Sequence, residues 1–178
     1  MTPPSPQRCA AVFAQVERVI EERWGVPVRI RDVPHPFTGD LDGTEIHLDY
    51  DLEAEDSLFI VVHLFGHTVQ WNTDPEARAI GMHPGPWDDA TLARLRAYET
   101  DACRLSMQLF HDAGVHDLDQ WLSDFAACDY AYLEHLFRTG EKRPFRSFWT
   151  AGHPHLTPLA IPAFAPQRWT TRADGVVV

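Results

Sequence analysis

The feature that most constrains this chain is an apolar run, Ser57–Phe65, that continues in helical spacing to about Trp71. The run is rich in Val and Ile, which is also typical of a buried strand. Its extension beyond about 12 residues favours a helix instead. Asp56 or Ser57 is suited to cap the start of that helix. We therefore expect a buried helix in the first half of the chain.

The segments before this helix predict a helix, a strand, a turn and a strand, in that order. Apolar residues recur at helical spacing over 9–24, and Gly25 is suited to end that helix. Apolar and polar residues alternate over 26–33 and again over 44–48, as in half-buried strands. Residues 37–43 between them are of the types that form turns. These patterns indicate a small N-terminal β-sheet.

The segments after the buried helix are mostly helical. Residues 74–87 are broken by Pro and Gly, so we expect a loop with one helical turn. Residues 88–113 carry an apolar stripe behind a capping Asp88 or Asp89, and residues 118–137 carry another. The sequence thus predicts an α+β fold that is mostly helical.

The last 39 residues of the 178 contain five prolines and little periodicity, but also several aromatic residues. Such a segment is too apolar to be a free tail. We expect a domain over 1–139 and an extended Pro-rich C-terminal segment over 140–178 that wraps onto the same domain and adds contacts to its core.

Composition excludes several classes of function. Acidic residues outnumber basic ones by 26 to 15, which gives a net charge of −11, so nucleic-acid binding is not expected. No run approaches the roughly 20 apolar residues that span a bilayer, and the N-terminus has no signal-peptide core. The three cysteines, Cys9, Cys103 and Cys128, are odd in number and far apart, which favours free thiols. We expect a cytoplasmic protein that does not enter membranes.

Two histidines on the buried helix, His63 and His67, are candidate metal ligands. Their i, i+4 spacing puts both imidazoles on one helix face, where they can chelate one ion. They share that face with Ile60 and Trp71, so they point into the protein, and two buried imidazoles need a partner. A metal ion such as zinc supplies one to both.

Glu99 is the candidate third ligand. It lies on the apolar stripe of the helix over 88–113, in phase with Leu95 and Ala102, and a carboxylate that faces a core is rarely unpaired. Neighbouring Asp101 lies off that stripe. Two histidines on one helix and a carboxylate on the next form a common three-ligand metal site.

These residues carry a resemblance to a known family. The segment HLFGHTVQW resembles the HEXXH helix of the ImmA/IrrE-type metallopeptidases, and AYETDACRLSMQLF resembles their downstream segment with a zinc-binding glutamate. The resemblance covers residues 9–113. It implies a zincin-like fold in which His63, His67 and Glu99 are the zinc ligands.

One departure changes what the resemblance implies. The glutamate of HEXXH is the general base that takes a proton from zinc-bound water, and here Leu64 stands in its place. Losing a positioned base costs about a hundredfold to ten-thousandfold in rate. We therefore expect a metallopeptidase-like pseudoenzyme: a zinc-binding protein without efficient peptidase activity, which serves an unidentified protein or peptide ligand.

Three alternatives stay open. A hydrolase that takes its base from Glu45, Asp49 or His153 is the first. A non-haem iron enzyme is the second, because two histidines and one carboxylate also form its facial triad. The third is a metal-free domain, in which the histidines make hydrogen bonds and Glu99 pairs with an arginine such as Arg96 or Arg104.

Four residues are candidates for a pocket beside the metal. Leu64 lies between the two histidines, and Gln70 follows them on the same helix. His153 and His155, in GHPHLTP, would reach the site if the C-terminal segment folds over it. A Pro-flanked surface loop is the competing interpretation of these two histidines.

Overall fold

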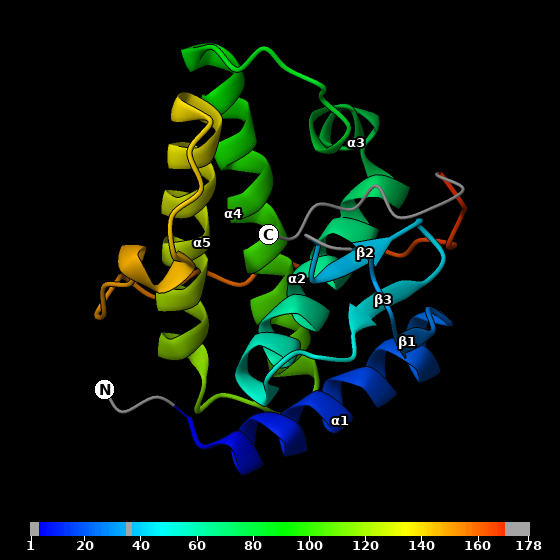
Figure 1. Cartoon of the computed structure of the whole chain (residues 1–178). Coiled ribbons are helices and arrows are strands. Elements are labelled where there is room, and N and C mark those ends of the chain that lie inside the picture. Colours follow the sequence, from blue (N-terminus) through cyan, green and yellow to red (C-terminus); the bar gives the residue numbers. More distant parts are fainter. Residues whose placement is uncertain (1–3, 35–36, 170–178) are drawn as a thin grey trace.

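The computed structural model of the chain describes residues 4–34 and 37–169, which form a mostly helical α+β fold with one small sheet (Figure 1). The elements follow one another as α1 (Pro6–Trp24), β1 (Val28–Arg31), β2 (Gly39–Leu41), β3 (Ile46–Asp49), α2 (Ala54–Thr73), α3 (Pro75–Gly81), α4 (Asp89–Asp112), α5 (Asp119–Thr139) and the short 3-10 helix η1 (Phe145–Phe148).

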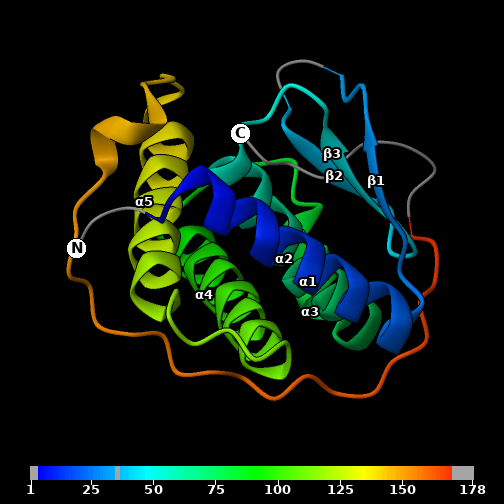
Figure 2. The same ribbon diagram turned by 90° about the horizontal axis from the view of Figure 1, so that it is seen from below.

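Helix α2 lies at the centre of the fold, as its apolar composition predicts. Every residue from Leu58 to Trp71 is buried. Helices α1 and α4 pack along α2, and α5 packs on α4 (Figure 2). The sheet, in the order β1-β3-β2, pairs β1 parallel and β2 antiparallel to β3, and β2 and β3 contact α2. Side chains of α2 therefore face three different neighbours.

Three local expectations need correction. The expected turn over 37–43 contains strand β2, which is buried throughout. The single helical turn expected within the loop over 74–87 is a longer helix, α3, of 7 residues, which starts where Pro75 occupies the first turn and the Asp74 carboxylate accepts a hydrogen bond from the backbone N–H of Glu76. Helix α2 begins at Ala54, before the predicted caps. The first turn of α2, which the sequence does not predict, contains Glu55, whose carboxylate accepts a hydrogen bond from Trp121 Nε1 on α5.

The other helices begin and end close to their predicted bounds. The Asp88 carboxylate caps α4 by accepting from the backbone N–H of Thr91 at 2.8 Å. Gly25 ends α1 with φ +66°, a left-handed conformation that a residue with a side chain adopts only with strain. Capping residues act within one turn of a helix end, so these helix bounds can be predicted from the sequence without knowledge of the fold.

The C-terminal segment lies across the domain in extended form. We call residues 149–169 the strap; Figure 2 shows its orange to red trace passing from α5 around to the sheet. Its apolar side chains pack against the core, and its backbone bonds to α4 and α5, for example from Leu159 N to Arg104 O at 3.0 Å. The remaining nine residues of the predicted segment, 170–178, lie outside the described residues.

Two expectations from composition can be compared with the structure. All three cysteines are buried and free, so no disulfide links them. Within residues 4–34 and 37–169, none of the helices combines the length and the hydropathy that crossing a bilayer requires.

Candidate metal centre

The three predicted ligands converge in the centre of the molecule. His63 Nε2 lies 2.9 Å from His67 Nε2, and Glu99 Oε2 lies 3.1 Å from His67 Nε2 and 3.3 Å from His63 Nε2. All three residues are buried, with exposed fractions of 2%, 4% and 7% for His63, His67 and Glu99. In a tetrahedral zinc site the donor atoms are separated by about 3.3 Å, given bonds of about 2.0–2.1 Å. The trio therefore has the spacing of a metal site.

A close approach of two helices brings the trio together. Gly66 lies between the two histidines, and a Cβ there would meet the carbonyl oxygen of Ala102 on α4 at 2.3 Å. Ser106 on α4 donates a hydrogen bond from Oγ to the carbonyl oxygen of Val62 on α2 at 2.7 Å. This bond joins the two helices one turn away from Gly66. Only glycine at position 66 lets α4 come near enough for Glu99 to reach both imidazoles.

Gln70 determines which nitrogen of His67 carries the proton. Its Nε2 donates to the carbonyl oxygen of Tyr98 at 2.8 Å, so its Oε1 faces His67 Nδ1 at 2.9 Å. An amide oxygen only accepts, so Nδ1 carries an N–H, and in the neutral form of the ring this leaves the lone pair on Nε2, which faces Glu99. The sequence predicts Gln70 as a pocket residue; the structure shows it holding the ring of His67, a candidate metal ligand.

His63 is held by two other side chains. Its ring stacks on Phe59 with centroids 5.1 Å apart, and its Nδ1 lies 3.4 Å from Cys103 Sγ. Burial raises the pKa of Cys103 well above its ordinary value, so the thiol stays neutral. His63 Nε2 is therefore directed at the same point as His67 Nε2 and Glu99 Oε2.

The charge at this point favours a bound cation. An ionised carboxylate only accepts, and each imidazole nitrogen that has lost its proton also offers an electron pair, so the trio can supply three electron-pair donors within hydrogen-bond distance. Without a metal, burial by itself raises the pKa of Glu99, but the charge of the two imidazoles in their protonated form and their hydrogen bonds outweigh it and lower that pKa to about 2. A proton bridges two of the donors at a time, whereas a metal ion binds all three. Two imidazoles and a carboxylate are a donor set that suits zinc.

The arginines proposed as partners of Glu99 are engaged elsewhere. Arg104 pairs with Asp101 at 2.8 Å, and the Arg96 guanidinium lies over the ring of Tyr130, 4.9 Å from its centre. The interpretation of Glu99 as a member of an arginine salt bridge is therefore wrong. In the described residues, its ion pairs are those with His63 and His67.

A fourth acidic residue near the trio, Asp129 on α5, was missed in the sequence. It is 5% exposed, and its Oδ2 lies 3.9 Å from His63 Nε2. Burial raises its pKa to about 7, with the charge of His63 opposing the rise and that of Glu99 adding to it. A signal was present: Asp129 follows Phe125 by four residues and precedes Tyr132 by three, so it lies on the apolar stripe of its helix.

Leu64 lines a cavity that reaches the trio. The cavity has a volume of about 220 Å³, and His67 and Glu99 also line it. Most of the remaining wall is apolar. His83 closes one edge, with its ring against Trp87 and its Nε2 donating to the carbonyl oxygen of Pro86. A ligand in this cavity would contact two of the candidate metal ligands and Leu64.

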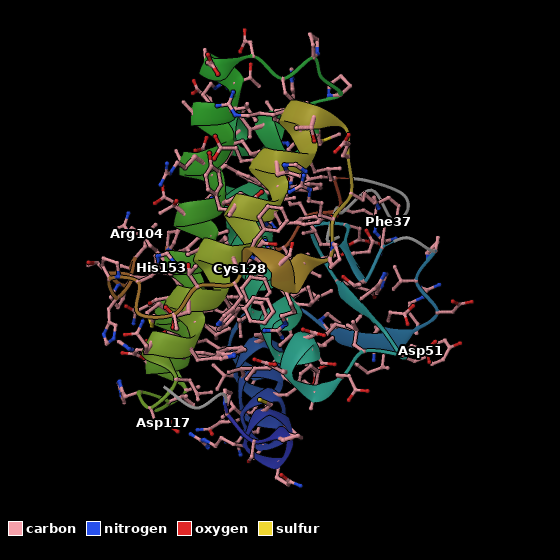
Figure 3. The ribbon with its side chains drawn as sticks, turned by 60° about the vertical axis from the view of Figure 1, so that its left-hand side comes forward. Phe37, Asp51, Arg104, Asp117, Cys128 and His153 are labelled. Carbon is pink, nitrogen blue, oxygen red and sulfur yellow. The ribbon has the colours of Figure 1, made fainter. Side chains whose placement is uncertain are left out.

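The two histidines of the strap are not brought to the trio. His153 lines a separate cavity that touches Glu99 and Cys103, but its Nε2 is 2.7 Å from Thr150 Oγ1. Figure 3 shows it on the side of the molecule where Arg104 lies. His155 Nε2 lies 2.9 Å from Gln120 Oε1. Both belong to a surface loop held on α5.

The other two proposed bases lie at the sheet. Glu45 Oε2 is 3.1 Å from His47 Nε2, and the Asp49 carboxylate accepts from the backbone N–H of Val33 at 2.9 Å. These contacts stabilise the sheet and its loops. Asp129 is thus a better-placed carboxylate than the three residues that the sequence suggested.

A second group of metal-binding side chains lies at the α4–α5 junction. His111 Nε2 is 3.0 Å from Asp119 Oδ2, and the ring of exposed His116 lies 4.4 Å from that of His111. The His111–Asp119 pair joins the C-terminal end of one helix to the N-terminal end of the next, where each charge is favoured by the helix dipole. This group is explained without a metal, but zinc measurements must control for it.

Comparison of the chain with models of protein families, with curated proteins and with solved structures finds no match. The resemblance to the ImmA/IrrE-type metallopeptidases therefore rests on its two short motifs and stays a prediction.

Proposed function

We propose that this protein binds one zinc ion through His63, His67 and Glu99 in a zincin-like fold, and that it is not an efficient peptidase. The observation that supports the proposal most is the convergence of three buried donor atoms within 3.3 Å of one another. Bound zinc would supply the positive charge that these donors lack, and the ligands would tie α2 to α4.

Position 64 argues against the peptidase mechanism of the family. Leu64 is 1% exposed, and a Cβ added to Gly39 on β2 would lie 2.9 Å from its Cδ1. The side chain packs between the sheet and the cavity and offers no atom that accepts a proton. The same apolar wall suits a ligand that binds in the cavity without being cleaved, such as a peptide with an apolar side chain.

Metal content tests the proposal directly. Mass spectrometry on untagged protein should find one zinc per chain, lost in both His63→Ala and Glu99→Ala. His111→Ala is the matched control, because it removes a histidine from the surface group and should leave the content unchanged. A parent protein that takes up no zinc after loading, or that carries iron instead, would contradict the proposal.

Activity provides the second measurement. Incubation of the zinc-loaded protein with casein and with a peptide library should give no zinc-dependent cleavage. Robust cleavage that disappears in His63→Ala would contradict the proposed loss of peptidase function, although the metal assignment would stand.

A further inference from the structure

Asp129 is a mostly buried carboxylate that opens onto a cavity, because no fully enclosed side-chain oxygen among the described residues lacks a hydrogen-bond partner. It is 5% exposed, and its one close polar contact in the described part of the chain is His63 Nε2 at 3.9 Å. A carboxylate that is largely withdrawn from water is destabilised as an anion unless a positive charge or a hydrogen-bond donor lies beside it. The position of Asp129 therefore suits a cation bound next to it.

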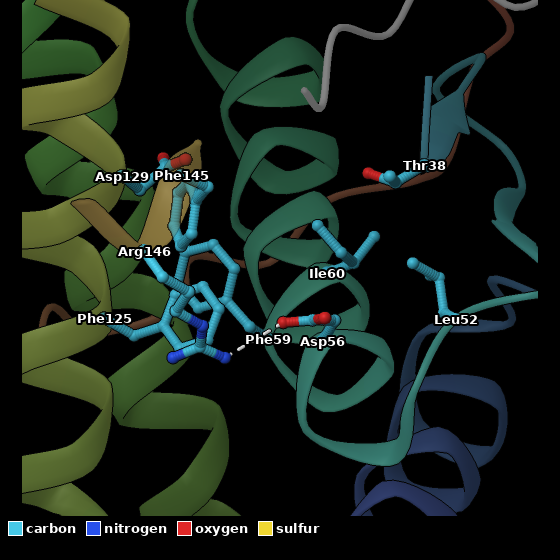
Figure 4. Close-up of a pocket in the computed structure, with 9 residues that line it drawn as sticks. All are labelled: Thr38, Leu52, Asp56, Phe59, Ile60, Phe125, Asp129, Phe145 and Arg146. Carbon is cyan, nitrogen blue, oxygen red and sulfur yellow. Dashed lines mark hydrogen bonds and ion pairs between the residues drawn. The ribbon is translucent and has the colours of Figure 1, made fainter. Parts of the chain in front are cut away.

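Among the described residues that line the cavity beside Asp129, no positively charged side chain pairs with it. It lines a cavity of about 160 Å³ whose walls include Phe59, Phe125 and Phe145 (Figure 4). The nearest arginine of that cavity, Arg146, is directed to Asp56 and to Glu55, which it contacts at 3.2 and 2.8 Å. The cation that Asp129 needs therefore has to come from the direction of His63.

We propose that Asp129 is the fourth protein ligand of the metal, together with His63, His67 and Glu99. The inference rests on the proposed zinc site. Asp129 Oδ2 lies 3.9 Å from His63 Nε2, beyond the tetrahedral donor spacing of about 3.3 Å, and it stands outside the group of His63, His67 and Glu99 donor atoms that lie within 4.8 Å of one another, so its side chain must turn toward the ion when the metal binds. The other three separations, 2.9, 3.1 and 3.3 Å, already match the tetrahedral spacing.

A fourth protein ligand would explain why no glutamate is needed at position 64. Catalytic zinc sites keep a position open for water, whereas structural sites are filled by four protein ligands. A site closed by Asp129 has no place for a reacting water, so a base at position 64 has no use. The zinc would then join three helices, α2, α4 and α5, and act as a structural element.

Zinc affinity of Asp129→Asn, measured by competition with a chromophoric chelator, tests the inference. The amide is a poor zinc ligand, so we expect affinity to fall about 10- to 100-fold. Asp124→Asn is the matched control: Asp124 is buried on the same helix but accepts from the backbone N–H groups of Gly152 and His153. Its affinity should equal that of the parent, and Asp129→Glu should restore most of the lost affinity.

Cobalt substitution gives a readout that does not depend on stability. Co²⁺ in the parent should show the strong visible bands of four-coordination, unchanged from neutral to alkaline pH, the range in which the ligands stay deprotonated. In Asp129→Asn, water completes the set, so the spectrum should become pH-dependent. Equal affinity and equal spectra in the parent and Asp129→Asn would overturn the inference and leave the zinc site intact. If the parent binds no metal at all, it is the proposed function that fails.

Discussion

Leu64 determines the chemical character of the candidate metal centre at the scale of a single residue. It packs against β2 at Gly39 and is 1% exposed. Replacing it with glutamate creates an HEXXH sequence, but it also buries a carboxylate beside Glu99, another lining residue of the same cavity. We expect Leu64→Glu to lower the free energy of unfolding of the zinc-free protein by about 2–4 kcal/mol.

Urea unfolding at neutral pH measures this change. Leu64→Met, which keeps the volume and the apolar character, should cost less than about 1.5 kcal/mol. If the glutamate variant proves as stable as the parent, the cavity admits enough water to solvate a carboxylate, and the loss of the base would need another explanation.

Spacing in the sequence is sufficient to predict that His63, His67 and Glu99 converge, because helical periodicity places each of them on the buried face of its helix. The same reasoning could have found Asp129, which shares the apolar stripe of α5, but periodicity does not show which helix that stripe faces. The distance of Asp129 from His63 is a property of the packing of α5, and no local pattern determines it. Gln70 was noticed, but its hydrogen bond to His67 needed the structure.

The contact between α2 and α4 controls the site at the scale of secondary-structure elements. Gly66→Ala adds a Cβ that would lie 2.3 Å from the carbonyl oxygen of Ala102, which is backbone and cannot rotate away. The two helices must separate, so Glu99 would withdraw from the histidines. We expect a loss of about 2–4 kcal/mol in stability and at least a tenfold loss in zinc affinity.

Calorimetry and chelator competition on the same preparation measure the two effects. Gly114→Ala is a matched control, because a Cβ there meets nothing within 4 Å; it should cost only the strain of a positive φ and leave zinc affinity unchanged. Normal zinc affinity in Gly66→Ala would show that the close approach of α2 and α4 is not what positions Glu99.

Asp42 fixes the connection between β2 and β3. Its Oδ1 accepts from the backbone N–H groups of Thr44 and Glu45 at 2.8 and 2.9 Å, and Arg168 pairs with its Oδ2 at 2.7 Å. Burial alone raises its pKa, but these hydrogen bonds and the arginine outweigh it and lower the pKa. A lowered pKa in the folded state means that the carboxylate stabilises the fold above the ordinary aspartate pKa of about 3.9, and that this stabilisation is lost as the pH falls.

We therefore expect Asp42→Asn to cost about 1–2 kcal/mol at neutral pH, and the difference from the parent to shrink below about pH 4. Denaturant unfolding over a range of pH measures it. Asp51→Asn, at an exposed aspartate of the next loop, should change stability by less than about 0.5 kcal/mol. A difference for Asp42→Asn that stays constant down to pH 2 would show that the charge of Asp42 does not matter.

The elements that could be predicted are those with a strong local signal. Helices α1, α4 and α5 carry a clear apolar stripe and end signals, so their bounds were nearly right. Strand β2 is hidden in the sequence because turn-forming residues such as Gly39, Asp40 and Gly43 dominate the segment, which does not alternate. It is a strand because it forms a hairpin with β3 and packs on α2, and the α2 contact comes from Ile60 and Leu64, which lie farther along the chain.

The strap ties distant parts of the whole molecule together, and its far end depends on Asn72. The amide nitrogen of Asn72 donates to the carbonyl oxygens of Gly43 and Thr68, and its oxygen accepts from the backbone N–H of Gln167 at 2.8 Å. One side chain thus joins α2, the β2–β3 loop and the strap. The nearby ring of Trp169 lies under the Arg78 guanidinium, 3.6 Å from its centre.

We expect Asn72→Ala to free this end of the strap, because the backbone of Gln167 loses its partner and no other group can reach it without movement of the chain. Trypsin should then cut after Arg168 several-fold faster than in the parent, as followed by mass spectrometry, since local opening exposes the bond to the protease. Thr73→Ala, which removes a hydroxyl that bonds only to Val69 O on the same helix end, should leave that rate unchanged. Zinc affinity should also be unchanged, because α2, α4 and α5 carry all four proposed ligands. If the rate of cleavage does not rise, the stacking of Arg78 on Trp169 and the pair of Arg168 with Asp42 are sufficient to hold the strap without Asn72.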